Sequence, residues 1–83
     1  MRSIENKYPI SGRVIRVEPI RRHNGEIAIQ AGGARLLTFD DGRQIQFSEG
    51  ALPYNGALTD ENLVGCTLRW SLTRSGPLSS IVV

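Results

Sequence analysis

A strict alternation of apolar and polar side chains near the C-terminus constrains the fold most strongly. In residues 67–73, Leu68, Trp70 and Leu72 are apolar, and each is flanked by polar or charged residues. A period of two places successive side chains on opposite faces of a β-strand, whereas an amphipathic helix repeats about every 3.6 residues. We therefore expect a half-buried strand with these three side chains on its inner face.

The same alternation recurs in residues 43–48, where Ile45 and Phe47 are expected to face the core and the polar residues between them to face solvent. Asp40-Asp41-Gly42 precedes this segment and follows the apolar run 36–39. Aspartate before glycine is typical of a tight turn between antiparallel strands. We predict a hairpin here.

Two further strands are indicated upstream by Asn24-Gly25, a strong signal for a two-residue hairpin turn. This turn is expected to join residues 11–17, extending toward residue 22, to residues 26–30 and thus to make an extended first hairpin. Gly32-Gly33 then interrupts the second strand, as a bulge or a bend would.

The rest of the chain holds a long loop and a last strand. Residues 49–66 contain Pro53 and several glycines, which predicts a loop, and Thr59 is placed to cap a single helical turn through residues 60–62. The last strand is expected at residues 78–83, after a turn at 75–77. Five short strands predict a small all-β antiparallel barrel, because closure removes exposed sheet edges. Both an OB-type and an SH3-like barrel fit this count.

Length and composition limit the remaining possibilities. At 83 residues the chain is expected to be one domain, with residues 1–10 as a lead-in to the barrel. One cysteine and one histidine exclude an intramolecular disulfide framework and leave too few ligands for a zinc site, so we expect no metal and no cofactor. Residues 1–7 carry charges and no apolar run, and no stretch is long enough to span a membrane. A cytoplasmic protein without a membrane partner is expected.

The charge is unevenly distributed. Residues 1–25 hold six cations and two acids, a net charge of +4, whereas the remaining residues have a net charge of −2. Nine of the ten cations are arginine. A local excess of positive charge attracts a polyanion over about a Debye length, so the first hairpin is the candidate surface.

From Gly12 onward, the chain resembles the bacterial cold-shock domain. The resemblance is carried by residues 12–15, 37–42 and 44–52, by residues 65–72, and by Gly76-Pro77 and Val82. It implies a five-stranded OB barrel that binds single-stranded DNA or RNA. The family's stacking aromatics are nearly all absent, since their positions hold Ala34 and Leu36 in the second strand and Gln46 and Ser48 in the third.

These observations predict a non-catalytic module that binds single-stranded nucleic acid weakly, through its phosphates. Arginine binds phosphate in a bidentate fork and can stack on a base. The candidate contacts are Arg21, Arg22 and His23 at the hairpin tip, Arg16, which would extend this surface toward the barrel, and Gln46 as a hydrogen-bonding group.

The alternative is a protein-interaction or oligomerisation module without nucleic-acid binding. Ala34, Leu36 and Val17 would form an aliphatic face in place of the family's aromatics, and the hairpin edge could pair with a second copy. Tyr54 lies in a loop where it could be exposed, whereas Phe39 and Phe47 are expected in the core with Trp70.

Catalysis is not expected. His23 has no nucleophile or orienting carboxylate near it in the sequence, and Asp40-Asp41 is explained by turn chemistry. Asp60-Glu61 suits the first turn of a helix, and Cys66 suits a small buried position. The glycine-rich residues 31–34 lack the Lys-Ser/Thr of a phosphate-binding loop.

Overall fold

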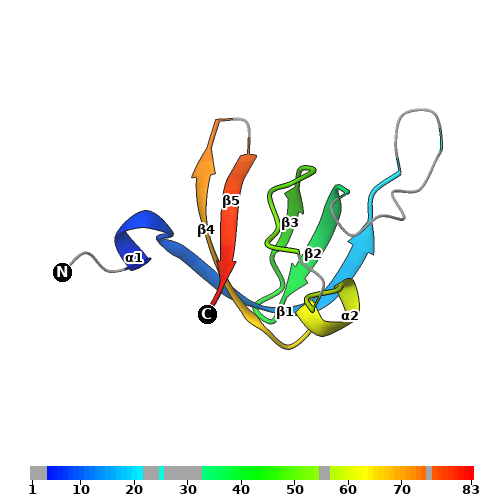
Figure 1. Cartoon of the computed structure of the whole chain (residues 1–83), viewed down its shortest axis with the longest axis horizontal. Helices are drawn as coiled ribbons and strands as arrows, with labels where there is room; N and C mark the ends of the chain where they lie inside the picture. Colours follow the sequence, from blue (N-terminus) through cyan, green and yellow to red (C-terminus); the bar gives the residue numbers. More distant parts are fainter. Residues whose placement is uncertain (1–3, 22–24, 26–32, 55–56, 75) are drawn as a thin grey trace.

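The computed structural model describes residues 4–21, 25, 33–54, 57–74 and 76–83. They form one antiparallel sheet whose five strands follow the order β3-β2-β1-β4-β5, and the two outer strands approach each other to give a nearly closed barrel (Figure 1). This confirms the predicted all-β barrel. The strands are β1 (Ile10–Pro19), β2 (Arg35–Phe39), β3 (Gln44–Phe47), β4 (Thr67–Thr73) and β5 (Gly76–Val82).

The connection between β1 and β2 contains most of what the structure leaves undescribed. The predicted strand at residues 26–30 and the tip of the first hairpin, residues 22–24, lie outside the described residues. β1 ends at Pro19, between the predicted segment 11–17 and its extension toward residue 22, and its partner in the sheet is β2 at Arg35–Phe39.

β1 is the strand that holds the two halves of the barrel together (Figure 1). Its first half pairs with β4, from Ile10 opposite Trp70 to Arg13 opposite Thr67. Its second half pairs with β2, and the register slips by one residue at Ile15. A bulge of this kind bends a strand and increases its twist, which lets one strand serve both halves of a small barrel.

The core is built around three aromatic rings, as the alternation predicted. Trp70 is 1% exposed, and Phe39 and Phe47 are fully buried. The Phe39 and Trp70 ring centroids are 4.8 Å apart in a stacked arrangement, and Phe47 meets Trp70 edge to face at 5.5 Å. These contacts unite β2, β3 and β4, and they confirm the predicted inward register of β3 and of the first half of β4.

Leu72 is where the prediction for β4 is wrong. Its side chain is 60% exposed, although Leu68 and Trp70 are buried. Leu72 lies near the end of the strand, where the β4–β5 register shifts between Ser71 and Leu72. β5 also begins two residues earlier than predicted, at Gly76.

The predicted turn and helix cap are both present. Gly42 adopts a φ of 90°, and the Arg43 N–H donates to Asp41 Oδ1 at 3.0 Å. Thr59 caps α2 (Asp60–Leu63) by accepting from the Asn62 N–H at 3.3 Å. A second short helix, α1 (Ile4–Lys7), was not predicted. Within the described residues, no helix has the length and apolar character needed to cross a membrane.

Candidate functional site

The exposed sides of β1, β2 and β3 form one polar surface. The register sets Arg16 opposite Thr38 and Thr38 opposite Gln44, and it sets Glu18 opposite Leu36 and Leu36 opposite Gln46. Residues directly opposite each other on neighbouring strands share a face. The outer face is therefore made of Arg16, Glu18, Leu36, Thr38, Gln44 and Gln46.

Arg16 owes its place on the outer face to the bulge at Ile15. Arg13 and Arg16 are three residues apart, so in a regular strand they would lie on opposite faces. The extra residue at Ile15 shifts the alternation, so that Arg13 and Arg16 are both exposed while Val14 and Val17 turn toward the core. The bulge thus concentrates positive charge on the outside of β1.

Arg16 forms an ion pair with Glu18 that is exposed to solvent. Its Nε lies 3.0 Å from Glu18 Oε1, and its side chain is 69% exposed. Exposed ion pairs contribute about 0–1 kcal/mol. Arg16 could therefore exchange Glu18 for an anionic ligand at small cost.

Arg21 lies beyond the end of β1, and its exposed side chain donates from Nη1 to the Gly25 carbonyl at 3.1 Å. Arg22 and His23, the other two candidate contacts at the hairpin tip, lie outside the described residues. Of the five candidate residues, Arg16 and Gln46 share the outer face, and Arg21 continues the strand that carries Arg16.

The neutral part of the outer face offers hydrogen-bonding amides. Gln44 donates from Nε2 to Thr38 Oγ1 at 3.3 Å, and Gln46 is exposed two residues further along β3. Leu36 is half-buried between these polar groups. Primary amides can both donate to and accept from base edges or peptide groups.

The aliphatic face expected from Val17, Ala34 and Leu36 is wrong in one member. Val17 lies opposite Leu37 and packs against the core, so it leaves the outer face. The cause is again the bulge, which shifts every residue after Ile15 to the other side of the strand. Of the three residues, Leu36 is the one that the register places on the outer face, so the apolar part of this face is small.

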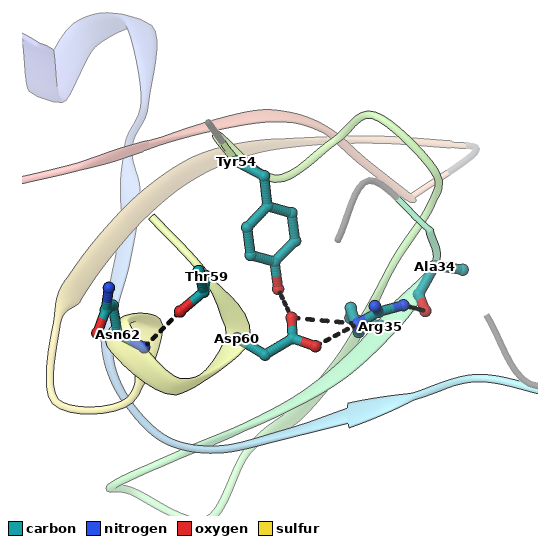
Figure 2. A network of polar contacts seen from close by, with 6 residues as sticks. All are labelled: Ala34, Arg35, Tyr54, Thr59, Asp60 and Asn62. Atoms are coloured by element: carbon teal, nitrogen blue, oxygen red, sulfur yellow. Dashed lines mark hydrogen bonds and ion pairs between the residues drawn. The ribbon is translucent and has the colours of Figure 1, made fainter. Parts of the chain in front are cut away.

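Sequence reasoning missed a buried arginine network that ties the loop before α2 to the barrel (Figure 2). Arg35 points inward from β2 and is 1% exposed. Its Nε donates to Asp60 at 3.2 and 3.1 Å, and its Nη1 donates to the Ala34 carbonyl at 3.0 Å. The Tyr54 hydroxyl donates to the same carboxylate. The network comprises Arg35, Tyr54 and Asp60.

Tyr54 is therefore not the exposed loop side chain suggested by its sequence context. It is half-buried and hydrogen-bonded in the network. Burial, followed by the hydrogen bond to Asp60 and its negative charge, raises the pKa of Tyr54 well above the ordinary value of 10.0. A phenol held protonated as a donor to a carboxylate has a structural role here, since ionisation would set two negative charges side by side.

This raised pKa predicts a loss of stability in alkali. A raised pKa means that the folded state keeps a proton which the unfolded chain loses, so the contribution is complete below about pH 10 and declines as pH rises above that value. Urea unfolding between pH 8 and 11 should show the decline in the natural chain. Tyr54→Phe should flatten the curve, and an identical slope in that variant would contradict the assignment.

Arg43 is also committed to the structure. Its guanidinium lies 5.4 Å from the Phe39 ring centroid and 5.6 Å from that of Trp70, and its Nη2 donates to the Ser11 carbonyl at 2.7 Å. Asp41 Oδ2 lies 2.6 Å from its Nε. This arginine covers one end of the aromatic core, so it is not part of the outer face.

A cleft of about 700 Å³ lies beside the outer face, between β3 and the β4–β5 turn. Its volume is within the ~300–1,000 Å³ common for ligand sites. Its lining mixes polar, charged and small residues, namely Ala34, Gln46, Phe47, Ser48, Glu49, Arg74 and Gly76.

The described residues bring no three His, Cys, Asp or Glu side chains together as a metal site would require. Cys66, expected to be buried, is half-buried, and its Sγ donates to the Asn62 carbonyl at 3.2 Å.

Comparisons with protein-family models, curated proteins and solved structures found no match.

Proposed function

We propose that this chain is a non-catalytic module that binds single-stranded nucleic acid through the outer face and the Arg-rich end of the first hairpin. The observation that carries the proposal is the outward placement of Arg16 by the bulge, in one row with Thr38 and Gln44. The cation binds phosphate, and the hydroxyl and amide groups hydrogen-bond to bases or sugars.

The architecture supports this reading through its likeness to the OB barrel. The strand order β3-β2-β1-β4-β5, with a short helix between β3 and β4, favours an OB-type over an SH3-like barrel. In OB folds the β2–β3 face is a common site for oligonucleotides. With the stacking aromatics of the cold-shock domain missing, affinity in this chain rests on phosphate contacts and is therefore weak and salt-sensitive.

The direct test is a titration of labelled single-stranded and duplex oligonucleotides at two salt concentrations. The natural chain should bind the single strand more tightly, and the affinity should fall steeply with salt. Removing two phosphate contacts in Arg16→Ala/Arg21→Ala should lower the slope of log K against log salt by about 1.4, since each single-strand phosphate contact contributes about 0.7.

Lys7→Ala is the matched control, because Lys7 is an exposed cation on α1, which packs against β4 and away from β2 and β3. It should leave the salt slope nearly unchanged. Absence of binding at low salt, or equal effects of Lys7→Ala and of Arg16→Ala/Arg21→Ala on the salt slope, would contradict the proposal.

A second candidate function, a protein-interaction module, is favoured by one observation. Ile15 is 51% exposed and Val64 is 46% exposed. The two lie near each other, because the Gly65 N–H, next to Val64, donates to the carbonyl of Val14, next to Ile15. Two exposed aliphatic side chains near each other suit a protein contact better than a phosphate backbone. Light scattering separates the two functions: a dimer that ignores oligonucleotides supports this one.

A further inference from the structure

The cleft beside the outer face lies along an unpaired edge of the sheet. β3 is the first strand in the sheet order. Within the described residues β5 approaches its second edge, but no strand pairs with that edge. The cleft is lined by Gln46, Phe47, Ser48 and Glu49 on the β3 side and by Arg74 and Gly76 from the β4–β5 hairpin. Of the two charged residues, Glu49 already has an interaction partner. β3 is short, with four residues, but it contains no charge, no proline and no bulge, which are the other common protections of an edge strand.

The backbone of Gln46 points into this open side. The Phe39 N–H donates to the Arg43 carbonyl, so these two residues are a hydrogen-bonded pair. Antiparallel ladders alternate, so Ile45 and Phe47 also point their backbone groups at β2, and Gln46 points its own away. Among the described residues, no backbone bond to the Gln46 N–H or carbonyl is formed on that side.

A cation marks the opposite wall of the cleft. Arg74 is exposed and makes no hydrogen bond or ion pair with the part of the chain that the structure describes. A ligand that meets both walls needs a donor and an acceptor for Gln46 and an anionic group for Arg74. An extended peptide has both backbone groups at regular spacing, whereas a sugar–phosphate backbone offers acceptors but few donors.

The position of the edge also argues against a second copy of this chain. The edge of β3 lies inside a cleft whose far wall is the β4–β5 hairpin. Two such edges would have to meet across two projecting hairpins, which keeps them apart. A slender segment of another protein has no such obstacle.

We propose that this cleft binds an extended acidic segment of a partner protein, which adds to β3 as a further strand through the Gln46 backbone and places a carboxylate at Arg74. Strand addition gains affinity from main-chain hydrogen bonds and specificity from side-chain contacts such as this one. The inference does not rest on nucleic-acid binding, because it uses the backbone edge of β3 and Arg74. The two sites share Gln46, whose side chain lies on the outer face and whose backbone lies at the edge.

The test is an NMR titration of the ¹⁵N-labelled chain with a capped octapeptide of alternating valine and aspartate. The Gln46 and Ser48 amides should shift saturably, with a Kd of about 1 mM or tighter, and hydrogen exchange at Gln46 should slow by about ten-fold. The same peptide N-methylated at every second residue keeps its charge and loses its donors, so it should bind about ten-fold more weakly.

Matched variants separate the backbone from the side chain. Gln46→Pro removes the edge-facing N–H, which an edge strand tolerates, together with the side-chain amide, and it should weaken binding about ten-fold. Gln46→Ala removes the side-chain amide alone and should keep binding. Arg74→Ala should weaken binding several-fold and Lys7→Ala should not. If Gln46→Pro does not fold, the N-methylated peptide and Arg74→Ala decide.

Four results would overturn the proposal. The peptide could shift only amides outside the cleft, or the N-methylated peptide could bind equally well. Saturable shifts at Gln46 caused by an oligonucleotide and not by the peptide would assign the cleft to nucleic acid. Shifts at Gln46 that depend on protein concentration alone would assign it to a second copy.

Discussion

Asp60→Ala is expected to lower the free energy of unfolding by about 3 kcal/mol, because it removes the carboxylate partner of a buried guanidinium. Arg35 is 1% exposed and would keep its bond to the Ala34 carbonyl, but its charge would lose the opposite charge beside it. In a domain of this size the melting temperature should fall by roughly 12–24 °C. Thermal and urea unfolding measure both quantities.

Two further variants test whether the buried charge is the cause. Glu61→Ala removes the next acid of the same helical turn, which is exposed, and should cost less than about 0.5 kcal/mol. Arg35→Met removes the charge itself and leaves Asp60, which is 37% exposed, to be hydrated. It should therefore cost less than Asp60→Ala. The reverse order would show that the helix start, and not the buried cation, makes Asp60 important.

Gly12→Ala is expected to cost about 2 kcal/mol, because β1 has no room for a side chain at this point. An added Cβ would lie 2.7 Å from Arg43 Nη2 and 2.7 Å from Phe39 Cδ1. The Phe39 ring is held against Trp70 in the core and cannot move freely. Overpacking of this kind typically costs about 1–3 kcal/mol, and urea unfolding would measure it.

Ser11→Ala is the control on the same strand, since Ser11 is exposed and bonds to Arg43 through its backbone carbonyl. It should change stability by less than about 0.5 kcal/mol. The double variant Gly12→Ala/Arg43→Ala should cost less than the sum of the two single changes, because Arg43→Ala removes one of the two clashing groups. Additive losses would contradict the proposed clash.

The fold was predictable wherever a period of two or a turn sequence acts locally. The alternation in residues 43–48 and the Asp41-Gly42 turn predicted β3, its hairpin and the inward rings, and Thr59 predicted the start of α2. These features depend on neighbours within a few residues, which a sequence displays directly.

The bulge at Ile15 could not be predicted in this way. It inserts one residue where β1 passes from β4 to β2, and this depends on the path of three strands at once. Its consequence is large, because it exchanges the faces of Arg16 and Val17. Tertiary structure, and not the local sequence, therefore decides which residues of β1 lie on the outer face.

The buried arginine network was unpredictable for a related reason. Arg35 and Asp60 are 25 residues apart, and each has an ordinary local explanation, one in a strand and the other at a helix start. The one signal in the sequence is that Arg35 occupies an inward position of β2, where an apolar residue is expected. The half-buried place of Tyr54 was unpredictable for the same reason, because its hydroxyl donates to Asp60 of this network.

Binding of single-stranded nucleic acid to the outer face of β1, β2 and β3 is tested most directly by an NMR titration. The ¹⁵N-labelled chain is titrated with a short single-stranded oligonucleotide at low salt. We expect saturable amide shifts grouped around Arg16, Thr38 and Gln44 that disappear at high salt. Shifts confined to α1 and the β4–β5 hairpin, or none at low salt, would contradict the account.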